Sequence, residues 1–144
     1  MKTRGARRRA PEPGRTAALV DIARDARQMA HAPYSKFKVG AALLCGSGEI
    51  VTGCNIENAS YGLTLCAERT AVFKAVSEGF RDFEAIAVVA DSPRPTAPCG
   101  PCRQILWEFC GDIWVHMSRP GRRGKTTSYR MSDLLPLPFD GRNL

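Results

Sequence analysis

The feature that most constrains this chain is a set of three cysteines arranged around one glutamate. Cys66 stands two residues before Glu68, and a C-x-x-C pair, Cys99 and Cys102, follows 33 positions after Cys66. Three thiolates can hold a zinc ion and leave its fourth position open, which is the arrangement that catalytic zinc uses. Any fold of this chain that uses the site must bring these two distant segments together.

Both cysteine segments are expected at the start of a helix. Residues 66–78 carry an apolar stripe and stop at Gly79, and Pro101 opens a second helix over 102–110. Helix N-termini carry partial positive charge, which favours thiolate over thiol. Three thiolates on Zn²⁺ leave one net negative charge, and we expect Arg69 to offset it by hydrogen bonding to the cysteine sulfurs.

Glu68 is the candidate catalytic group. It is close enough to a metal ligand to reach both a water at the open zinc position and a substrate atom, and its carboxylate can accept and return a proton. Zinc lowers the pKa of bound water from about 15.7 to about 7. Together these groups suit the hydrolytic loss of an amine, in which hydroxide attacks an amidine-like carbon and ammonia leaves after protonation.

Strands and helices alternate along the rest of the chain. We expect a helix from Thr16 to just before Pro33, strands at 37–45, 49–53, 84–90, 112–117 and 127–130, and a short helical turn at 132–135. This order predicts an α/β fold with a mixed sheet between helices, a three-layer α/β/α architecture. The polar loop at 55–62 follows a hairpin, where binding groups tend to lie.

Charge and length define one domain with a basic tail. Residues 1–15 hold six of the 21 Lys and Arg residues and one acidic residue, so most of the net charge of +7 lies there. We expect a disordered tail over 1–15, a single catalytic domain over 16–144, and no nucleic-acid partner.

The cellular location is inferred from two sequence features. No apolar run is long enough to span a membrane, and the N-terminus lacks the apolar segment of a secretion signal, so we expect a cytoplasmic protein.

Two alternatives to a catalytic zinc site are a structural zinc site and a redox-active cysteine pair. We expect Cys45, Cys54 and Cys110 to be buried, unreactive thiols, and His31 and His116 to be structural or surface residues. A non-catalytic zinc site would need a fourth ligand, for which Cys110 or His116 could serve. A thioredoxin-like redox role for the C-x-x-C pair would leave the segment at 66–68 unexplained.

Two motifs, Cys66-Ala67-Glu68 and the stretch PCGPC at 98–102, form the zinc-deaminase signature in its three-cysteine form. Longer stretches at 34–43, 53–62 and 134–139 narrow the match. On these residues the chain resembles the short, homotetrameric, zinc-dependent cytidine deaminases, from about residue 16 to residue 139. That family has a five-stranded mixed sheet between helices and one Zn²⁺ per subunit.

The resemblance implies hydrolytic deamination of cytidine and 2′-deoxycytidine to uridine and 2′-deoxyuridine, with release of ammonia in pyrimidine salvage. It implies that Asn55 and Glu57 bind a ribose hydroxyl, that Phe37 lines the nucleoside pocket, and that the backbone around Ala67 and Cys99 reads the pyrimidine edge.

The resemblance also implies a site shared between subunits, in which a neighbouring subunit of a homotetramer contributes Tyr61 and Phe139. Other deaminase substrates remain open, namely an aminonucleoside of the blasticidin S type and a polynucleotide cytosine. A polynucleotide would require a basic body surface with stacking aromatics, whereas most of the basic residues here lie in the tail.

Overall fold

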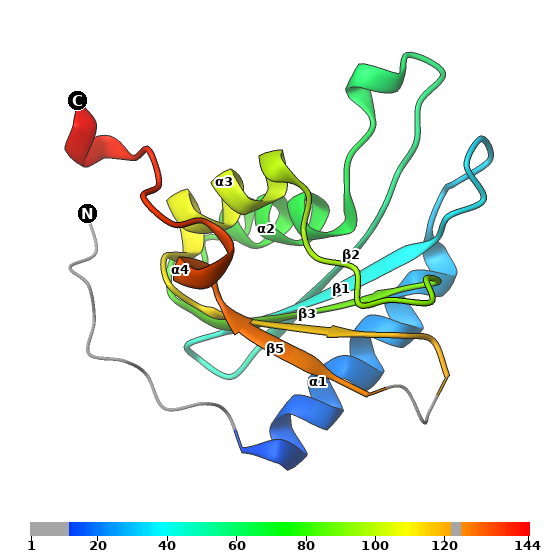
Figure 1. Cartoon of the computed structure of the whole chain (residues 1–144), viewed down its shortest axis with the longest axis horizontal. Coiled ribbons are helices and arrows are strands. Elements are labelled where there is room, and N and C mark those ends of the chain that lie inside the picture. Colours follow the sequence, from blue (N-terminus) through cyan, green and yellow to red (C-terminus); the bar gives the residue numbers. More distant parts are fainter. Residues whose placement is uncertain (1–11, 122–124) are drawn as a thin grey trace.

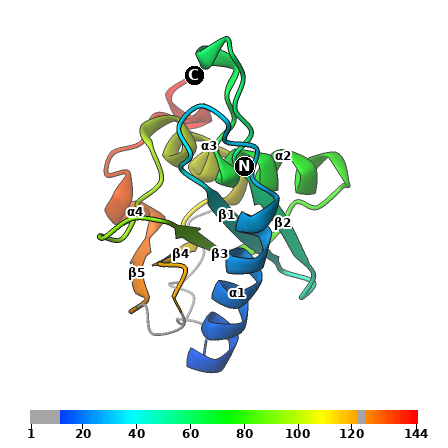
Figure 2. The same ribbon diagram turned by 90° about the vertical axis from the view of Figure 1, so that its right-hand side faces the viewer.

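The computed structural model describes residues 12–121 and 125–144. Its elements in chain order are α1 (Pro13–Ala26), β1 (Val39–Cys45), β2 (Ile50–Cys54), α2 (Ala67–Ser77), β3 (Phe83–Ala90), α3 (Gly100–Cys110), β4 (Trp114–Ser118), β5 (Thr127–Arg130) and α4 (Met131–Leu134). Helix α1 covers one face of the sheet, and α2 and α3 cover the other (Figures 1 and 2). The predicted three-layer α/β/α architecture with a five-stranded mixed sheet is confirmed.

The sheet brings the two cysteine segments to one edge. Its strand order is β2-β1-β3-β4-β5, with β3 and β4 parallel and the other neighbouring strands antiparallel. Val39 pairs with Ala90, and Gly40 pairs with Cys54. The start of β1 and the ends of β2 and β3 therefore meet, and the segments that leave this edge lead into α2 and α3.

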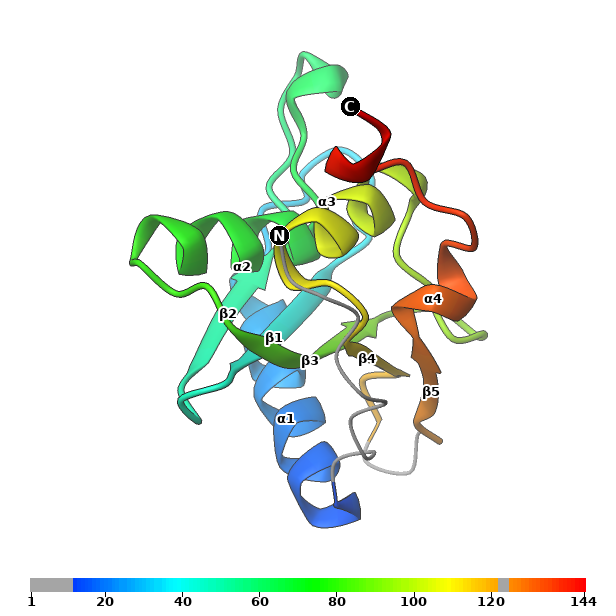
Figure 3. The same ribbon diagram turned by 90° about the vertical axis from the view of Figure 1, so that its left-hand side faces the viewer.

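The core is built from the alternating side chains of the central strands. All seven residues of β1 are buried, as expected for a strand that is covered on both faces. Val39, Ala41 and Leu43 pack in one cluster with α2 and α3 residues, whereas Ala42 and Leu44 pack in a second cluster with α1 residues. Figure 3 shows α2 and α3 side by side over the first of these faces.

Two glycines allow the helices to lie close to the sheet. A Cβ atom on Gly40 would lie 2.1 Å from the carbonyl oxygen of Ala23 in α1, and one on Gly53 would lie 2.4 Å from the carbonyl oxygen of Ala67 in α2. Both neighbouring atoms belong to the backbone, so a side chain could not be accommodated by a rotamer change. Gly53 thereby sets how closely the first turn of α2 approaches the sheet.

Most predicted elements are confirmed, and the differences lie at their ends. Helix α1 begins at Pro13, three residues before the expected start, because the fixed φ of proline suits the first turn of a helix. A one-turn 3₁₀ helix, Arg27–Met29, follows α1. The last residues of the predicted 1–15 tail are thus helical, and residues 1–11 lie outside the described residues. None of the described helices is long and apolar enough to cross a membrane.

The three cysteines outside the candidate zinc site, Cys45, Cys54 and Cys110, have the surroundings of unreactive thiols. Cys45 and Cys110 are buried and Cys54 is half-buried. Burial raises the pKa of Cys45 and of Cys54, so both remain protonated near neutral pH. His31 is exposed and His116 is buried, as surface and structural residues respectively.

Candidate active site

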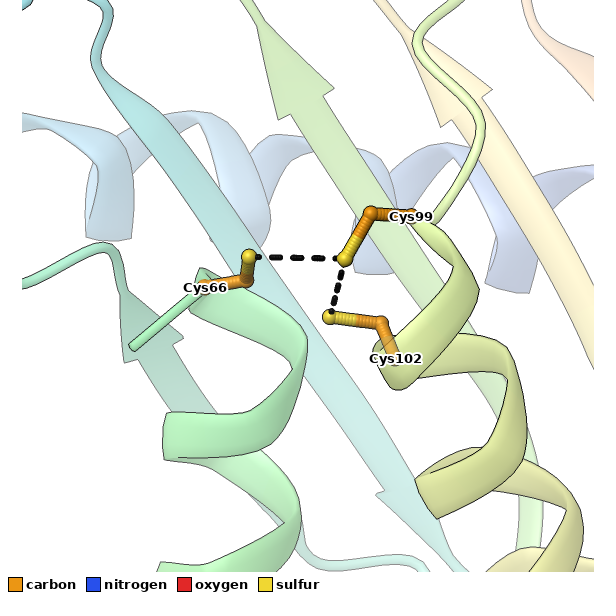
Figure 4. Close-up of side chains that lie close together, drawn as sticks. All are labelled: Cys66, Cys99 and Cys102. Atoms are coloured by element: carbon orange, nitrogen blue, oxygen red, sulfur yellow. Dashed lines mark hydrogen bonds between the residues drawn. The ribbon is translucent and has the colours of Figure 1, made fainter. Parts of the chain in front are cut away.

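Three thiols from two helix starts converge at the edge of the sheet. The Sγ atoms of Cys66, Cys99 and Cys102 all lie within 4.8 Å of one another. Cys66 and Cys99 are separated by 3.7 Å, and Cys99 and Cys102 by 3.3 Å (Figure 4). These distances are far longer than a disulfide bond, and all three cysteines are free. The set has the residue types and spacing of a zinc site.

Two of the three thiols lie at helix starts, and one of these two, Cys66, is shifted toward its ionised form. Cys66 is the N-cap residue of α2 and Cys99 is the N-cap residue of α3, so both lie at the positive ends of helix dipoles. Hydrogen bonding to Cys102, and then to Arg69, lowers the pKa of Cys66 to about 5. The shared proton stays on Cys102, whose pKa is raised by its bond to Cys66. A metal cation would displace that proton, because zinc binds thiolates.

No fourth ligand from the described part of the chain completes the site. Among the described residues, the cluster of metal-ligating side chains holds the three cysteines and omits His116 and Cys110. Val115 and Met117 of β4 pack on the α2 and α3 side, so alternation places His116 on the α1 side of the sheet. Three thiols with an open fourth position fit a catalytic zinc rather than a structural one.

Arg69 lies against the metal segment. Its Nη2 donates to Cys66 Sγ at 3.3 Å and to the carbonyl oxygen of Thr64 at 3.4 Å. The thiol in turn raises the pKa of Arg69, so the guanidinium stays charged. This contact is the one expected from the sequence for a positive charge that offsets three thiolates.

Glu68 is buried beside the thiols. Its side chain is 4% exposed, and Oε2 lies 3.9 Å from Cys102 Sγ. Removal from water raises the pKa of Glu68 to about 7. A carboxylate with a pKa near the working pH can both take up and release a proton, which is the property required of a general acid and base.

A pocket of about 180 Å³ opens beside Glu68 and the thiols. Its lining residues are Phe37, Val39, Asn55, Thr64, Leu65, Cys66, Ala67, Glu68, Thr96, Ala97 and Cys99. The pocket thus includes Phe37, Asn55 and Ala67, three of the substrate-binding residues expected from the sequence. Its walls are mainly apolar, with a small number of polar side chains among them, as in small-molecule sites generally.

Asn55 and Glu57 brace the loop that precedes β1. Asn55 accepts a bond from the N–H of Val39 at 2.9 Å and donates to the carbonyl oxygen of Phe37 at 2.7 Å. Glu57 accepts bonds from the N–H groups of Tyr34 and Ser35 and from the Ser35 hydroxyl. The Ser35 hydroxyl bond lowers the pKa of Glu57. Asn55 reaches the pocket wall, whereas Glu57 is not among the lining residues.

Tyr61 and Phe139 lie away from the pocket of their own chain. Tyr61 is 61% exposed in the loop between β2 and α2, which projects from the body of the molecule (Figure 1), and its ring packs against Tyr34. Phe139 is 59% exposed in the C-terminal segment beside α3. Neither residue lines the pocket, so both rings are available at the surface.

Five lining residues were not expected from the sequence. Thr64 and Leu65 directly precede the Cys66 segment, and Thr96 and Ala97 directly precede the PCGPC stretch. Extending each motif by two residues toward the N-terminus would have found these four. Val39 carries no such signal, because an apolar residue at the start of a buried strand is normally part of the core.

The sequence of this chain is similar to those of known proteins. Residues 14–117 match the family described as "Cytidine and deoxycytidylate deaminase zinc-binding region". A cytidine deaminase from Halalkalibacterium halodurans is 52% identical over 127 residues, which cover 88% of this chain and 95% of that protein. A more distant relative, the blasticidin-S deaminase of Bacillus cereus, is 33% identical over 129 residues, covering 84% of this chain and 89% of that protein.

A solved structure gives the same result for the fold. The crystal structure of cytidine deaminase from Burkholderia pseudomallei superposes with a TM-score of 0.81 at 48% identity, and the match covers 85% of this chain and 97% of that one. The family match spans most of the chain and includes all three cysteines and Glu68. The chain therefore belongs to the cytidine deaminase family.

Proposed function

We propose that this protein is a zinc-dependent cytidine deaminase that converts cytidine and 2′-deoxycytidine to uridine and 2′-deoxyuridine. The observation that carries the proposal is the buried carboxylate of Glu68, which lies in one pocket with the three-thiol cluster. A pocket that joins a metal site to a proton carrier suits hydrolysis by water.

The proposed roles follow from position. Cys66, Cys99 and Cys102 would hold one Zn²⁺, which when bound supplies a Lewis acid that makes water a nucleophile near neutral pH. Glu68 takes a proton from the attacking water and delivers it to ring nitrogen N3 of the cytosine. It then carries the remaining hydroxyl proton to the amine nitrogen on C4. The C4–O bond forms, the C4–N bond breaks, and the nitrogen leaves as ammonia, so water and cytidine give uridine and ammonia.

Substrate binding is proposed for further residues in and beside the pocket. Phe37 would contact the face of the base, and the backbone at Ala67 would bind its polar edge. Asn55 Nδ2 has a second hydrogen beyond its bond to Phe37, and Glu57 Oε2 can accept a second bond beyond that from Ser35. Both groups can therefore meet a ribose hydroxyl without giving up the contacts that brace the loop.

We also propose a homotetramer with shared sites. Tyr61 and Phe139 are large exposed aromatic residues, and aromatic side chains are enriched at interfaces between subunits. A neighbouring subunit's pocket would cover both rings and close the open side of the nucleoside site. We propose the cytoplasm as its compartment, where the three free thiols stay reduced.

Cytidine is favoured over blasticidin S because the relatives with higher identity, near 50%, are named cytidine deaminases, whereas the blasticidin-S deaminase is 33% identical. The test is an ammonia-release assay of the zinc-loaded protein on cytidine, 2′-deoxycytidine, blasticidin S and a cytosine-containing oligonucleotide. We expect a kcat/KM for both nucleosides at least about 100-fold above that for blasticidin S, a difference of about 2.7 kcal/mol. A preference for blasticidin S or the oligonucleotide would overturn the proposal.

A further inference from the structure

Arg103, in the first turns of α3, binds backbone carbonyl groups of the segment that precedes Cys99 and of α4. Its Nε donates to the carbonyl oxygen of Pro98 at 2.7 Å, and its Nη1 donates to the carbonyl oxygen of Leu134 at 2.7 Å. Its backbone N–H donates to the carbonyl oxygen of Cys99 at 3.0 Å. Arg103 thus binds the carbonyl groups of two consecutive residues, Pro98 and Cys99, and Cys99 is an expected zinc ligand.

The arrangement parallels that of Arg69 on the other ligand helix. Arg69 lies three residues after Cys66 and reaches back to the carbonyl of Thr64 and to the thiol. Arg103 lies four residues after Cys99 and reaches back to the carbonyl of Pro98. Each ligand-bearing helix start therefore has an arginine that bonds the chain just before the ligand, although Arg103 acts on the backbone and not on the sulfur.

The segment before Cys99 needs such a donor. Two of the five residues at 97–101 are prolines, which have no N–H group to tie the segment to its neighbours. Pro98 is fully buried, so its carbonyl oxygen requires a partner within the protein. The Nε group of Arg103 provides it at a short distance, and the charge on the guanidinium strengthens the bond.

We propose that Arg103 is a positioning residue that fixes Cys99 for zinc binding. Without the side-chain bond to Pro98, the segment that leads into Cys99 would lose one link to α3, and the Cys99 thiol would be held less firmly beside those of Cys66 and Cys102. The bond to Leu134 ties the same segment to the end of α4, from which the C-terminal segment runs to Phe139. The inference rests on the zinc site of the proposed function, but not on the identity of the substrate.

The test compares zinc retention in Arg103→Met and in a matched control, Arg81→Met. Arg81 also donates to two backbone carbonyls, those of Val76 and Phe80, but at the far end of α2 from the thiols. Zinc loss to a competing chelator and the Co²⁺–thiolate absorption spectrum are measured for each zinc- or cobalt-loaded protein, together with the thermal midpoint of unfolding.

We expect Arg103→Met to bind zinc about 10- to 100-fold more weakly than the unsubstituted protein and to alter the Co²⁺ spectrum, because partners of metal ligands have effects of this size. Arg81→Met should lower the thermal midpoint while zinc affinity and spectrum stay unchanged. Arg103→Lys keeps the positive charge but not the two separate nitrogens that reach Pro98 and Leu134, so it should give a smaller loss, and it serves if the methionine variant does not fold.

Zinc affinity within twofold of the unsubstituted protein in both Arg103 variants, with an unchanged Co²⁺ spectrum, would overturn the proposal. Equal zinc loss in Arg81→Met at a matched thermal midpoint would also overturn it, because the loss would then follow general destabilisation. If the unsubstituted protein binds zinc but does not deaminate cytidine, the proposed function fails while the role of Arg103 is still decided by the metal measurements.

Discussion

The guanidinium of Arg69 lies 3.3 Å from the thiol of Cys66, within the first turn of the helix that Cys66 caps. This contact places a fixed positive charge beside the three thiols. When all three are ionised and bind Zn²⁺, the group carries one net negative charge, which Arg69 offsets. Zinc bound by three thiolates is a weaker Lewis acid than zinc bound by neutral ligands, so withdrawal of negative charge from one sulfur bears directly on reactivity.

Replacing Arg69 should weaken the metal site or the reaction while the fold is kept. We expect Arg69→Ala to lower zinc affinity or turnover about 10- to 100-fold, because it removes a charged hydrogen bond to a ligand and leaves the thiolate charge unbalanced. Chelator competition and initial rates measure the two effects. Lys74→Ala, which removes an exposed positive charge from the same helix, is the control. Equal behaviour of the two variants would show that Arg69 acts through net charge alone.

Gly53 should be intolerant of any side chain. Gly53→Ala places a Cβ within 2.4 Å of the backbone of Ala67, so we expect a loss of about 1–3 kcal/mol in the free energy of unfolding and weaker zinc retention as α2 is pushed from the sheet. Gly40→Ala creates an equally close contact with α1 and is the matched control. It should lose similar stability in urea unfolding while keeping its zinc. Unchanged stability in Gly53→Ala would contradict the packing described here.

His116 should make the protein less stable in weak acid. Burial lowers its pKa to about 4, whereas the unfolded chain would titrate near 6.5. The unfolded state therefore binds the proton first, and stability that is present above pH 6.5 is lost as the pH falls toward 4. We expect a loss of about 2 kcal/mol between pH 7 and pH 5, by linkage.

The control for this effect is His116→Asn, which can keep a hydrogen bond to Ser128 but does not titrate. Its free energy of unfolding, measured by urea at both pH values, should fall less than that of the unsubstituted protein. Parallel losses in the two proteins would assign the acid sensitivity to other groups, such as the thiols.

Phe139 should act on a neighbouring subunit. We expect Phe139→Ala to raise the KM for cytidine about 10- to 100-fold, since burying an aromatic ring is worth about 1.5–3 kcal/mol. Co-assembly with a Glu68→Gln variant provides the decisive comparison. In mixed oligomers, some sites would combine an intact Phe139 with an intact Glu68, and activity at low cytidine should exceed that of either variant alone. An absence of such recovery would show that Phe139 does not act on a neighbouring subunit's site.

The sequence predicted the layers of the fold because its periodicities are clear. Residues 39–45 alternate between two buried faces, and the stripe in α2 and the stop at Gly79 mark a helix without reference to anything else. The start of α1 was placed too late because Pro13 and Gly14 follow a polar, arginine-rich segment that masks the helix start.

The site could be predicted where side chains carry the chemistry and not where the backbone does. Cys66, Glu68 and Cys99 could be grouped by their residue types and spacing. Arg103 could not be identified in that way, since its partners are carbonyl oxygens that every residue possesses. Nor does spacing reveal that the Glu57 carboxylate accepts hydrogen bonds from the segment around Ser35, because that contact depends on how two loops fold together.

The most direct test is the turnover of cytidine by Glu68→Gln with its zinc content determined in the same sample. Glutamine keeps the size of the side chain, so we expect one zinc per subunit. Because glutamine cannot take up the proton, we expect kcat to fall by about 100- to 10,000-fold, the usual contribution of a general acid and base. Full zinc content with kcat within a few-fold of the unsubstituted protein would contradict the account, because Glu68 would then not be the group that moves the proton.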